Sequence, residues 1–267
     1  NERNAIIQHG TMTLVRRDAL EQIGGWAEWC ITEDAELGLR MFEHGYEAQY
    51  LPKSYGRGLI PESLLDYKKQ RFRWAFGAMQ ILRRHARALL SPSDPRLTSG
   101  QRYHFIAGWL PWVADGFNLI FNLGAIAWSL AMLLAPHRIE PPLVMFSLVP
   151  VAMSTFRLAK LAHLYVSRVG ANVRQTFAAA IAGLALAHTI GTAVLKSLLV
   201  RSQPFVRTPK EKTTHRFGEV VAAARQEVTM LIALLAAAYA LTYQIPLGPN
   251  RTLGIPQELQ SPDLSLW

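Results

Sequence analysis

The chain has 267 residues, of which 50% are apolar and 18% charged, and its formal net charge is +9. An average soluble domain carries roughly 25% charged residues, whereas here residues 1–102 hold 15 Lys/Arg and 12 Asp/Glu and the longer remainder holds only 13 and 7. The single cysteine excludes an internal disulfide, and cationic residues beside apolar stretches favour a membrane surface over nucleic acid as their partner.

The first hundred residues predict strands that alternate with helices. Residues 11–15, TMTLV, are a short β-branched run, and residues 46–51, YEAQYL, form a second strand-like run. Between them, residues 16–23 have a helical pattern that stops at the pair Gly24-Gly25. This alternation predicts the C-terminal part of an α/β domain over residues 1–102.

An acidic helix is predicted to follow Thr32, whose hydroxyl can cap it, and to end at Gly45. Glu33 and Asp34 then lie in the first turn, where the helix dipole favours negative charge. Such a carboxylate can accept a proton from a substrate. Its simpler role is helix-start electrostatics, and these residues alone favour that simpler role.

A basic and aromatic helix is predicted from Glu62 to about residue 90. Gln70, Arg73 and Trp74 share one face of it through three- and four-residue spacing, together with Gly77. An arginine fork suits a pyrophosphate, an amide adds hydrogen bonds, and an indole offers a flat surface for a sugar ring. A tryptophan beside arginines is also typical of an anchor at a membrane interface.

Beyond residue 102 the sequence predicts a membrane region, residues 103–267. Four stretches approach or exceed the roughly 20 apolar residues that cross a bilayer. One of them, residues 176–200, joins two basic connections and carries His188, Thr192 and Lys196 at four-residue spacing. We therefore expect an interfacial helix there, followed by a basic loop at 201–216. The expected spans are 104–134, 143–166 and 228–245.

This topology places the polar part and both basic connections on the cytoplasmic side of the membrane. An alternative is a set of ordinary crossings within a longer protein, with one basic loop outside. Positive-charge counting is a statistical rule, so both topologies remain open at this point.

Three motifs occur in order along the chain: Thr32-Glu33-Asp34, then Gln70-Arg71-Phe72-Arg73-Trp74, then PFVRTPK at 204–210. Together they resemble the membrane-embedded family 2 glycosyltransferases, which include bacterial cellulose synthase and the chitin and hyaluronan synthases. The resemblance extends from residue 5 to about residue 245. It implies a GT-A-like domain followed by interfacial and transmembrane helices.

The resemblance implies that Asp34 is the general base of an inverting transfer and that Glu33 supports it. It places the Gln70-to-Trp74 segment at the nucleotide diphosphate and the terminal acceptor sugar, while Arg71 alternatively faces lipid phosphates. The residues assigned to substrate binding are Thr32, Glu33, Gln70, Arg71, Arg73 and Trp74.

The third motif resembles the gating loop of cellulose synthase, a Phe-x-Val-Thr-x-Lys pattern. By that resemblance Phe205, Thr208 and Lys210 contact the bound nucleotide. Arg207 stands where the pattern has valine, and Glu211 where glycine is usual. The alternative is a solvated basic loop that lies against anionic lipid.

The resemblance also implies the partners. The implied donor is a UDP-sugar, with UDP-glucose preferred, and the implied acceptor is a growing β-glucan. The implied location is the bacterial inner membrane, with the catalytic part in the cytoplasm. Accessory membrane or periplasmic subunits are implied as further partners. Mg²⁺ or Mn²⁺ is expected on an Asp-x-Asp upstream of this chain, so we assign no metal ligand here and expect the chain alone to be inactive. The competing functions are a non-processive transferase acting on a lipid-linked acceptor and a non-catalytic membrane scaffold or transporter.

Overall fold

The computed structural model describes residues 3–10, 12–51, 53, 55–56, 58, 61, 63–135, 138–139, 145–204 and 217–244. The motif residues Phe205, Thr208 and Lys210 lie outside the described residues, so their assignment stays a prediction. The chain divides into two units, which we describe separately. The first comprises residues 1–119 and 186–225, and the second comprises residues 120–185 and 226–267.

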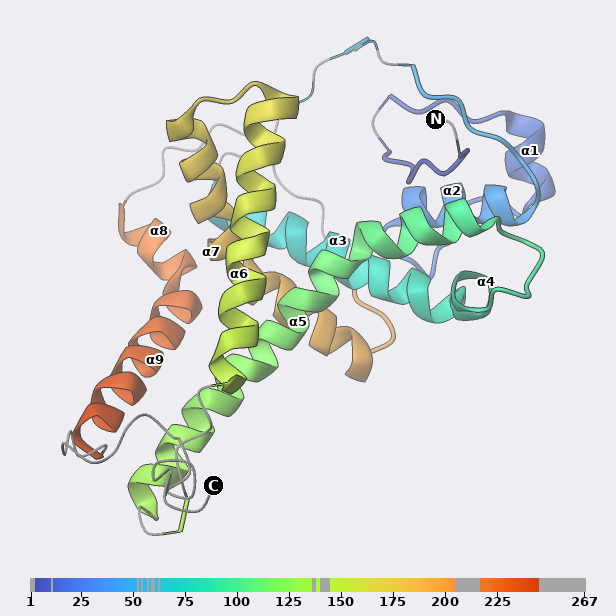
Figure 1. Cartoon of the computed structure of the whole chain (residues 1–267). Coiled ribbons are helices and arrows are strands. Elements are labelled where there is room, and N and C mark those ends of the chain that lie inside the picture. Colours follow the sequence, from blue (N-terminus) through green and yellow to red (C-terminus); the bar gives the residue numbers. More distant parts are fainter. Residues whose placement is uncertain are drawn as a thin grey trace, which may run out of the picture. The chain divides into compact units, whose positions relative to one another are not determined.

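The first unit is built from helices (Figure 1). The predicted helices after residue 16 and after Thr32 are both present. The long basic helix is present as two helices, because the backbone leaves helical geometry at His85. The unit contains α1 (Arg17–Gln22), α2 (Glu33–Glu43), α3 (Leu64–Arg84), α4 (Ala86–Leu90), the first part of α5 (Ser99–Leu134), the last part of α7 (Val173–Leu199) and α8 (Phe217–Ala223).

The described part of the chain contains no β-strand, so the structure does not confirm the α/β class expected for residues 1–102. Residues 12–15 and 46–51 lie outside the helices and form no ladder. A strand is stable only when its backbone groups pair with a neighbouring strand. Here the backbone N–H of Ala48 instead donates to Oδ1 of Asn4, at 2.8 Å.

The helix ends follow simple backbone chemistry, with one correction. Gly24 and Gly45 have φ of +88° and +82°, the left-handed conformation that ends α1 and α2. Ser63 caps α3, since its Oγ accepts from the backbone N–H of Asp66 at 3.0 Å. Thr32 precedes α2 as predicted, but its side chain makes no capping hydrogen bond, because the hydroxyl lies 3.5 Å from the sulfur of Cys30.

The core of the first unit is built from α2, α3, α4, α5 and α7. One cluster joins Ala75 and Phe76 of α3 to Ile190 and Ala193 of α7. The helices α5 and α7 meet where Gly191 faces α5, since a Cβ on Gly191 would lie 2.6 Å from the backbone oxygen of Asp115. Small residues at such a crossing allow two backbones to approach closely.

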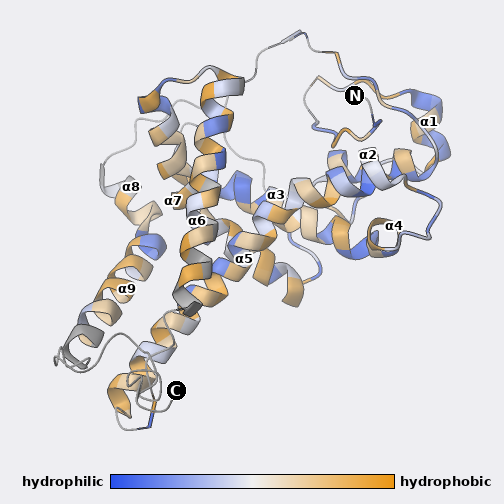
Figure 2. Ribbon diagram, viewed as in Figure 1, coloured by the Kyte–Doolittle hydropathy of each residue, from blue (hydrophilic) through white to orange (hydrophobic). Residues whose placement is uncertain are grey.

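The second unit contains helices whose apolar side chains are largely exposed, such as Phe156 at 63% and Leu235 at 60%. Figure 2 shows that apolar residues predominate along α5 and α9, whereas α1 and α2 mix hydrophilic and hydrophobic residues. Apolar side chains exposed along whole helices are expected where lipid is the solvent. The unit holds the rest of α5 and α7, α6 (Met145–Leu164), the π-helical turn η1 (Tyr165–Val169) and most of α9 (Arg225–Gln244).

Two of the described helices, α5 and α7, are long and apolar enough to cross a membrane. For α5 this agrees with the span predicted at 104–134. The length and composition of α7 suit a crossing as well as an interfacial position, so its interfacial placement stays a prediction. The predicted crossings at 143–166 and 228–245 correspond to α6 and α9, and their passage through the bilayer also stays a prediction.

Candidate active site

The acidic motif and the basic helix meet at a close contact between Thr32 and Gly77. A Cβ on Gly77 would lie 2.6 Å from Cγ2 and 2.8 Å from Cβ of Thr32, which is too short for any side chain. The absence of a side chain at Gly77 therefore lets α3 run directly against the start of α2. The helix face predicted from the spacing of Gln70, Arg73 and Trp74 includes this glycine.

Cys30 fills the space beside this contact. Its side chain is 5% exposed, and its sulfur lies 4.0 Å from the carbonyl oxygen of Gly77. Burial raises the pKa of the Cys30 thiol to about 11, although a hydrogen bond with Thr32 acts in the opposite direction. The thiol is therefore neutral near pH 7, and Cys30 packs as a small buried group.

Two backbone N–H groups hold the carboxylate of Asp34. Gly10 N donates to Oδ2 at 2.5 Å, and Ala35 N donates to Oδ1 at 2.8 Å. Each carboxylate oxygen keeps a further lone pair. The carboxylate is therefore fixed in orientation and still able to accept a proton.

No motif in the sequence identifies Gly10 as a neighbour of Asp34. A Cβ on Gly10 would lie 3.1 Å from Oδ2 of Asp34, so the glycine also provides the room for this hydrogen bond. Its only signal in the sequence is a glycine between two short polar runs, and 23 residues separate it from Asp34. That signal is too weak to predict the contact.

The indole of Trp74 is packed against Arg71. The guanidinium carbon of Arg71 lies 4.7 Å from the ring centre of Trp74 and 4.9 Å from that of Tyr67, and Arg71 also donates to the Tyr67 hydroxyl at 2.7 Å. A cation stacked on a ring face stabilises the orientation of that ring. Arg71 therefore supports Trp74 and Tyr67, rather than only facing lipid phosphates.

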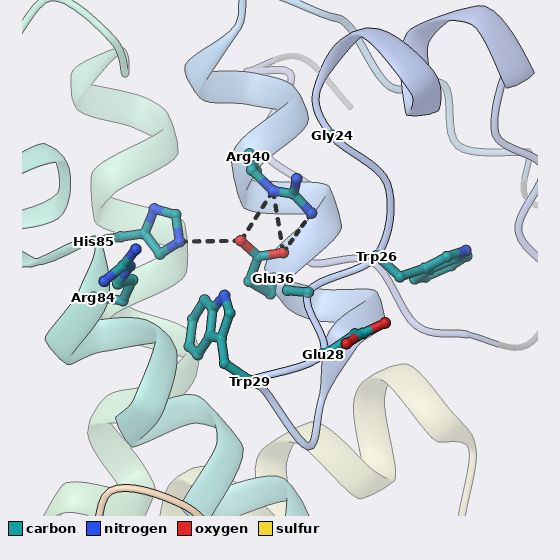
Figure 3. A pocket seen from close by; sticks show the side chains of 9 residues that line it. Gly24, Trp26, Glu28, Trp29, Glu36, Arg40, Arg84 and His85 are labelled. Atoms are coloured by element: carbon teal, nitrogen blue, oxygen red, sulfur yellow. Dashed lines mark hydrogen bonds and ion pairs between the residues drawn. The ribbon is translucent and has the colours of Figure 1, made fainter.

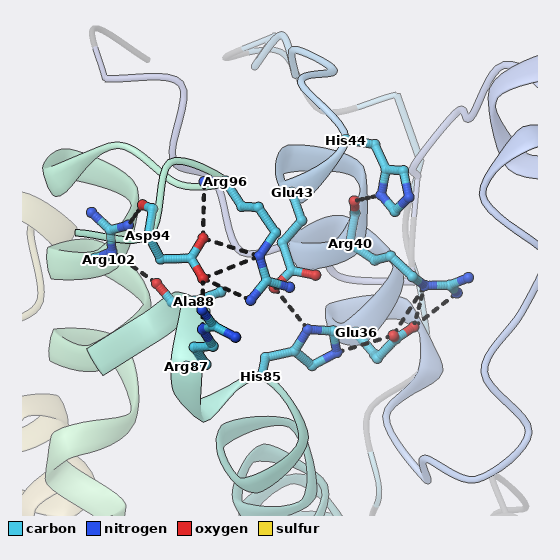
Figure 4. Close-up of polar contacts among 10 residues, drawn as sticks. All are labelled: Glu36, Arg40, Glu43, His44, His85, Arg87, Ala88, Asp94, Arg96 and Arg102. Atoms are coloured by element: carbon cyan, nitrogen blue, oxygen red, sulfur yellow. Dashed lines mark hydrogen bonds and ion pairs between the residues drawn. The ribbon is translucent and has the colours of Figure 1, made fainter. Parts of the chain in front are cut away.

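The opposite side of α2 is fixed by a buried charge network (Figure 4). Glu36 is 2% exposed, and its carboxylate accepts from Nε of Arg40 at 3.0 Å. Arg40 also donates to the backbone oxygens of Ile23 and Gly25, at 2.5 and 2.7 Å. The network therefore joins α2 to the turn that follows α1.

His85 connects the same network to the junction of α3 and α4. Its Nδ1 lies 2.9 Å from Glu43 and its Nε2 lies 3.3 Å from Glu36. Burial by itself would lower the pKa of His85, but the hydrogen bonds and charges of these two carboxylates outweigh it and raise the pKa to about 9. Burial would raise the pKa of Glu36, whereas its bonds to His85 and Arg40 lower it. The network is therefore charged at neutral pH.

A pocket of about 330 Å³ lies over this network (Figure 3). Trp26 and Trp29 are exposed at its rim, and Arg84 stacks on Trp29 with its guanidinium carbon 5.9 Å from the ring centre. The pocket contains neither Asp34 nor the Gln70-to-Trp74 segment. Glu36 and Asp34 are two positions apart and point to different sides of α2, so this pocket is separate from the candidate active site.

Within the described residues, no group of three or more His, Cys, Asp or Glu side chains could hold a metal ion. The residues of the candidate site therefore do not fit a divalent metal by themselves. We assign no step of the chemistry at Asp34 to a metal.

The geometry joins an oriented carboxylate to a helix that carries cationic, amide and aromatic side chains, as expected for a sugar-transferring site. A family model described as glycosyl transferase family group 2 matches residues 3–156, more than half of the chain. The chain therefore belongs to glycosyl transferase family group 2.

The particular relatives are cellulose synthases. The catalytic subunit of the UDP-forming cellulose synthase of Komagataeibacter sucrofermentans is 31% identical over 154 residues, 58% of this chain and 18% of that protein. The corresponding subunit of Xanthomonas axonopodis pv. citri is 41% identical over 80 residues, 30% of this chain and 11% of that protein. These comparisons confirm the family resemblance, and this chain spans less than a fifth of the length of either relative.

We expect Gly77→Ala in the full-length protein to lower the free energy of unfolding by about 1–3 kcal/mol, because the added methyl overlaps Thr32. Thermal unfolding in detergent would measure the loss. Gly124→Ala, where no atom lies within 4 Å of the added Cβ, is the matched helical control and should cost nothing. Combining Gly77→Ala with Thr32→Gly should recover part of the lost stability. If the two changes in the free energy of unfolding were strictly additive, the two residues would not be in contact.

We expect the stability contributed by His85 to fall as the pH rises. The pKa of His85 in the folded protein, about 9, exceeds its ordinary value of 6.5, so its contribution is complete below about pH 6.5 and is lost as the pH passes 9. Melting temperatures at pH 7 and pH 10 would measure the loss. His85→Gln has no proton to release, so its melting temperature should vary less over this range, and an identical pH dependence in both proteins would exclude His85 as the source.

Proposed function

We propose that this chain forms part of a processive, inverting glycosyltransferase that moves glucose from UDP-glucose to a growing β-glucan. The observation that carries the proposal is the contact of Thr32 with Gly77, which brings the start of α2 against the helix of Gln70, Arg73 and Trp74. Family membership supports a nucleotide-sugar donor. The names of the relatives support a UDP-linked donor and a cellulose-like product.

In the proposed reaction, the carboxylate of Asp34 removes the proton from the acceptor hydroxyl. The acceptor oxygen then attacks the anomeric carbon of the donor, the bond from that carbon to the phosphate oxygen breaks, and UDP leaves with the bonding electrons. Attack from the side opposite the leaving group inverts the anomeric configuration. The hydrogen bonds from Gly10 N and Ala35 N support this role because they fix the carboxylate without occupying all its lone pairs.

The neighbouring helix α3 supplies the binding groups in this proposal. Arg73 provides a planar fork for the diphosphate and Gln70 adds an amide. Arg71 covers part of the indole of Trp74 and holds its orientation, so the remaining ring surface receives the terminal sugar of the acceptor. Glu33 supports the carboxylate motif, and Thr32 positions it through Gly77.

The proposed setting is the bacterial inner membrane, with the motif side in the cytoplasm and the polymer passing between membrane helices. The apolar helices α5 and α7 support membrane insertion. Accessory membrane or periplasmic subunits belong to the same proposal. The divalent ion, Mg²⁺ or Mn²⁺, which would neutralise the departing diphosphate, would be held by residues outside this chain.

We expect Asp34→Asn in the full-length, membrane-inserted protein to lower the rate of sugar transfer from UDP-glucose by about 10²–10⁴-fold, because the amide cannot accept the proton. Trp74→Ala should shorten the product by loosening the acceptor sugar. Radiolabelled transfer and product sizing would measure both effects.

Asp18→Asn is the matched control, since Asp18 is an exposed acid in the first turn of α1 and shares only helix-start electrostatics with Asp34. It should leave transfer unchanged. A wild-type rate of transfer in Asp34→Asn would show that Asp34 is not the general base. A product of one sugar on a lipid would favour the lipid-linked acceptor, and absence of any transfer by the wild type would favour a scaffold or transporter.

A further inference from the structure

Gln80 is a buried polar residue in an otherwise apolar turn of α3, and its side chain is 5% exposed. Its Oε1 accepts from the backbone N–H of Ile31 at 3.2 Å. Its Nε2 donates to the backbone oxygen of Trp29 at 3.1 Å and to that of Arg201 at 2.9 Å. One side chain therefore binds three backbone groups from two distant segments.

These partners leave a single orientation for the amide. A glutamine side chain has two N–H donors and one carbonyl acceptor. Both donors face carbonyl oxygens and the acceptor faces an N–H, so exchanging the oxygen and the nitrogen would break all three hydrogen bonds. The side chain is thus fully specified by its surroundings, as expected for a group that sets the distance between segments rather than one that fills space.

One of the segments joined by Gln80 leads into the candidate active site, and the other follows α7. Residues 29–31 lead directly into the Thr32-to-Asp34 motif, and Arg201 follows the end of α7. Arg83, on the next turn of α3, also bonds to the backbone oxygen of Ser197 in α7. The helix α3 therefore holds both the loop before α2, residues 29–31, and the end of α7.

Gln80 lies too far along α3 to touch the reacting groups. It is six residues beyond Trp74, which corresponds to about 9 Å along the helix axis. It is closer to Gly77, whose contact with Thr32 lies about one turn away along the same helix. Any effect of Gln80 on the chemistry is therefore indirect and acts through the position of the loop before α2, residues 29–31.

We propose that Gln80 is a positioning residue that holds the loop before α2 at a fixed place along α3. Asp34 and Trp74 then contact the same acceptor sugar. This inference rests on the function proposed above. Misplacement of a catalytic group by 1 Å can cost about 10²-fold in rate. A loosened loop should therefore slow the chemical step while it leaves donor binding nearly intact.

The test uses Gln80→Met and Gln80→Glu in the full-length protein. Methionine keeps the volume and removes all three hydrogen bonds, while glutamate keeps the shape and the acceptor but removes both donors. We expect kcat for sugar transfer to fall about 10- to 100-fold in both variants, with KM for UDP-glucose changed less than about threefold. A loss confined to KM, or wild-type kcat in both variants, would overturn the inference.

Gln101→Met is the matched control. Gln101 is also 5% exposed, accepts from the backbone N–H of Thr98 at 2.9 Å and donates to the backbone oxygen of Asn4 at 2.9 Å. It should lower the melting temperature by a similar amount and keep kcat within about twofold, because its bonds do not join the motif segments. An equal fall of kcat in Gln101→Met would show a general stability effect and overturn the positioning role.

Hydrogen exchange separates this inference from the proposed function. The amide of Ile31 should exchange at least tenfold faster in Gln80→Met than in the wild type, whereas Gln101→Met should leave it protected. Unchanged protection of Ile31 in Gln80→Met would overturn the inference even in an active enzyme. If the wild type transfers no sugar, the proposed function fails, while faster exchange of Ile31 would still support Gln80 as the residue that holds the loop.

Discussion

The close contact of Thr32 with Gly77 is the constraint on which the candidate site depends. Residue 77 has no side chain, so α3 reaches the backbone turn that starts α2, and Thr32, two residues before Asp34, lies against the helix that carries Arg73 and Trp74. Thr32 and Gly77 are 45 positions apart in the sequence, so this contact joins two segments that are distant along the chain.

Two different kinds of interaction hold α2 against its surroundings. On one side the contacts are steric and neutral, through Gly77 and the amide of Gln80. On the other side they are ionic and buried, through Glu36, Arg40 and His85. Removing one partner of a buried ionic pair is costly because it leaves an uncompensated charge. The helix that begins with the acidic motif is thus constrained against rotation as well as translation.

The sequence predicts local features of this arrangement better than its long-range contacts. Helical periodicity, the acids of α2 and the glycine at its end identify that helix correctly, since these signals act within one or two turns. The strands expected at 11–15 and 46–51 are absent from the described residues, because strand pairing depends on a distant partner. The hydroxyl of Thr32 turns to Cys30 instead of capping, and Gly10 and Gln80 reach their partners across 24 and 49 positions or more. The only sign of this role in the sequence is that Gln80 is a polar residue within the apolar run AFGAMQIL.

The helix that carries the Gln70-to-Trp74 motif, α3, also packs on the apolar helix α7 of its unit. Ala75 and Phe76 follow Trp74 directly, and both are fully buried in the cluster that contains Ile31, Ile190 and Ala193. A displacement of α7 along its axis would therefore move atoms in van der Waals contact with the residues next to Trp74 and with the loop before Thr32. Because close-packed cores transmit strain rather than absorb it, the position of the Trp74 indole is mechanically linked to a helix long and apolar enough to cross a membrane. In the function proposed above, bond formation and movement of the product through the bilayer would then depend on one packed interface.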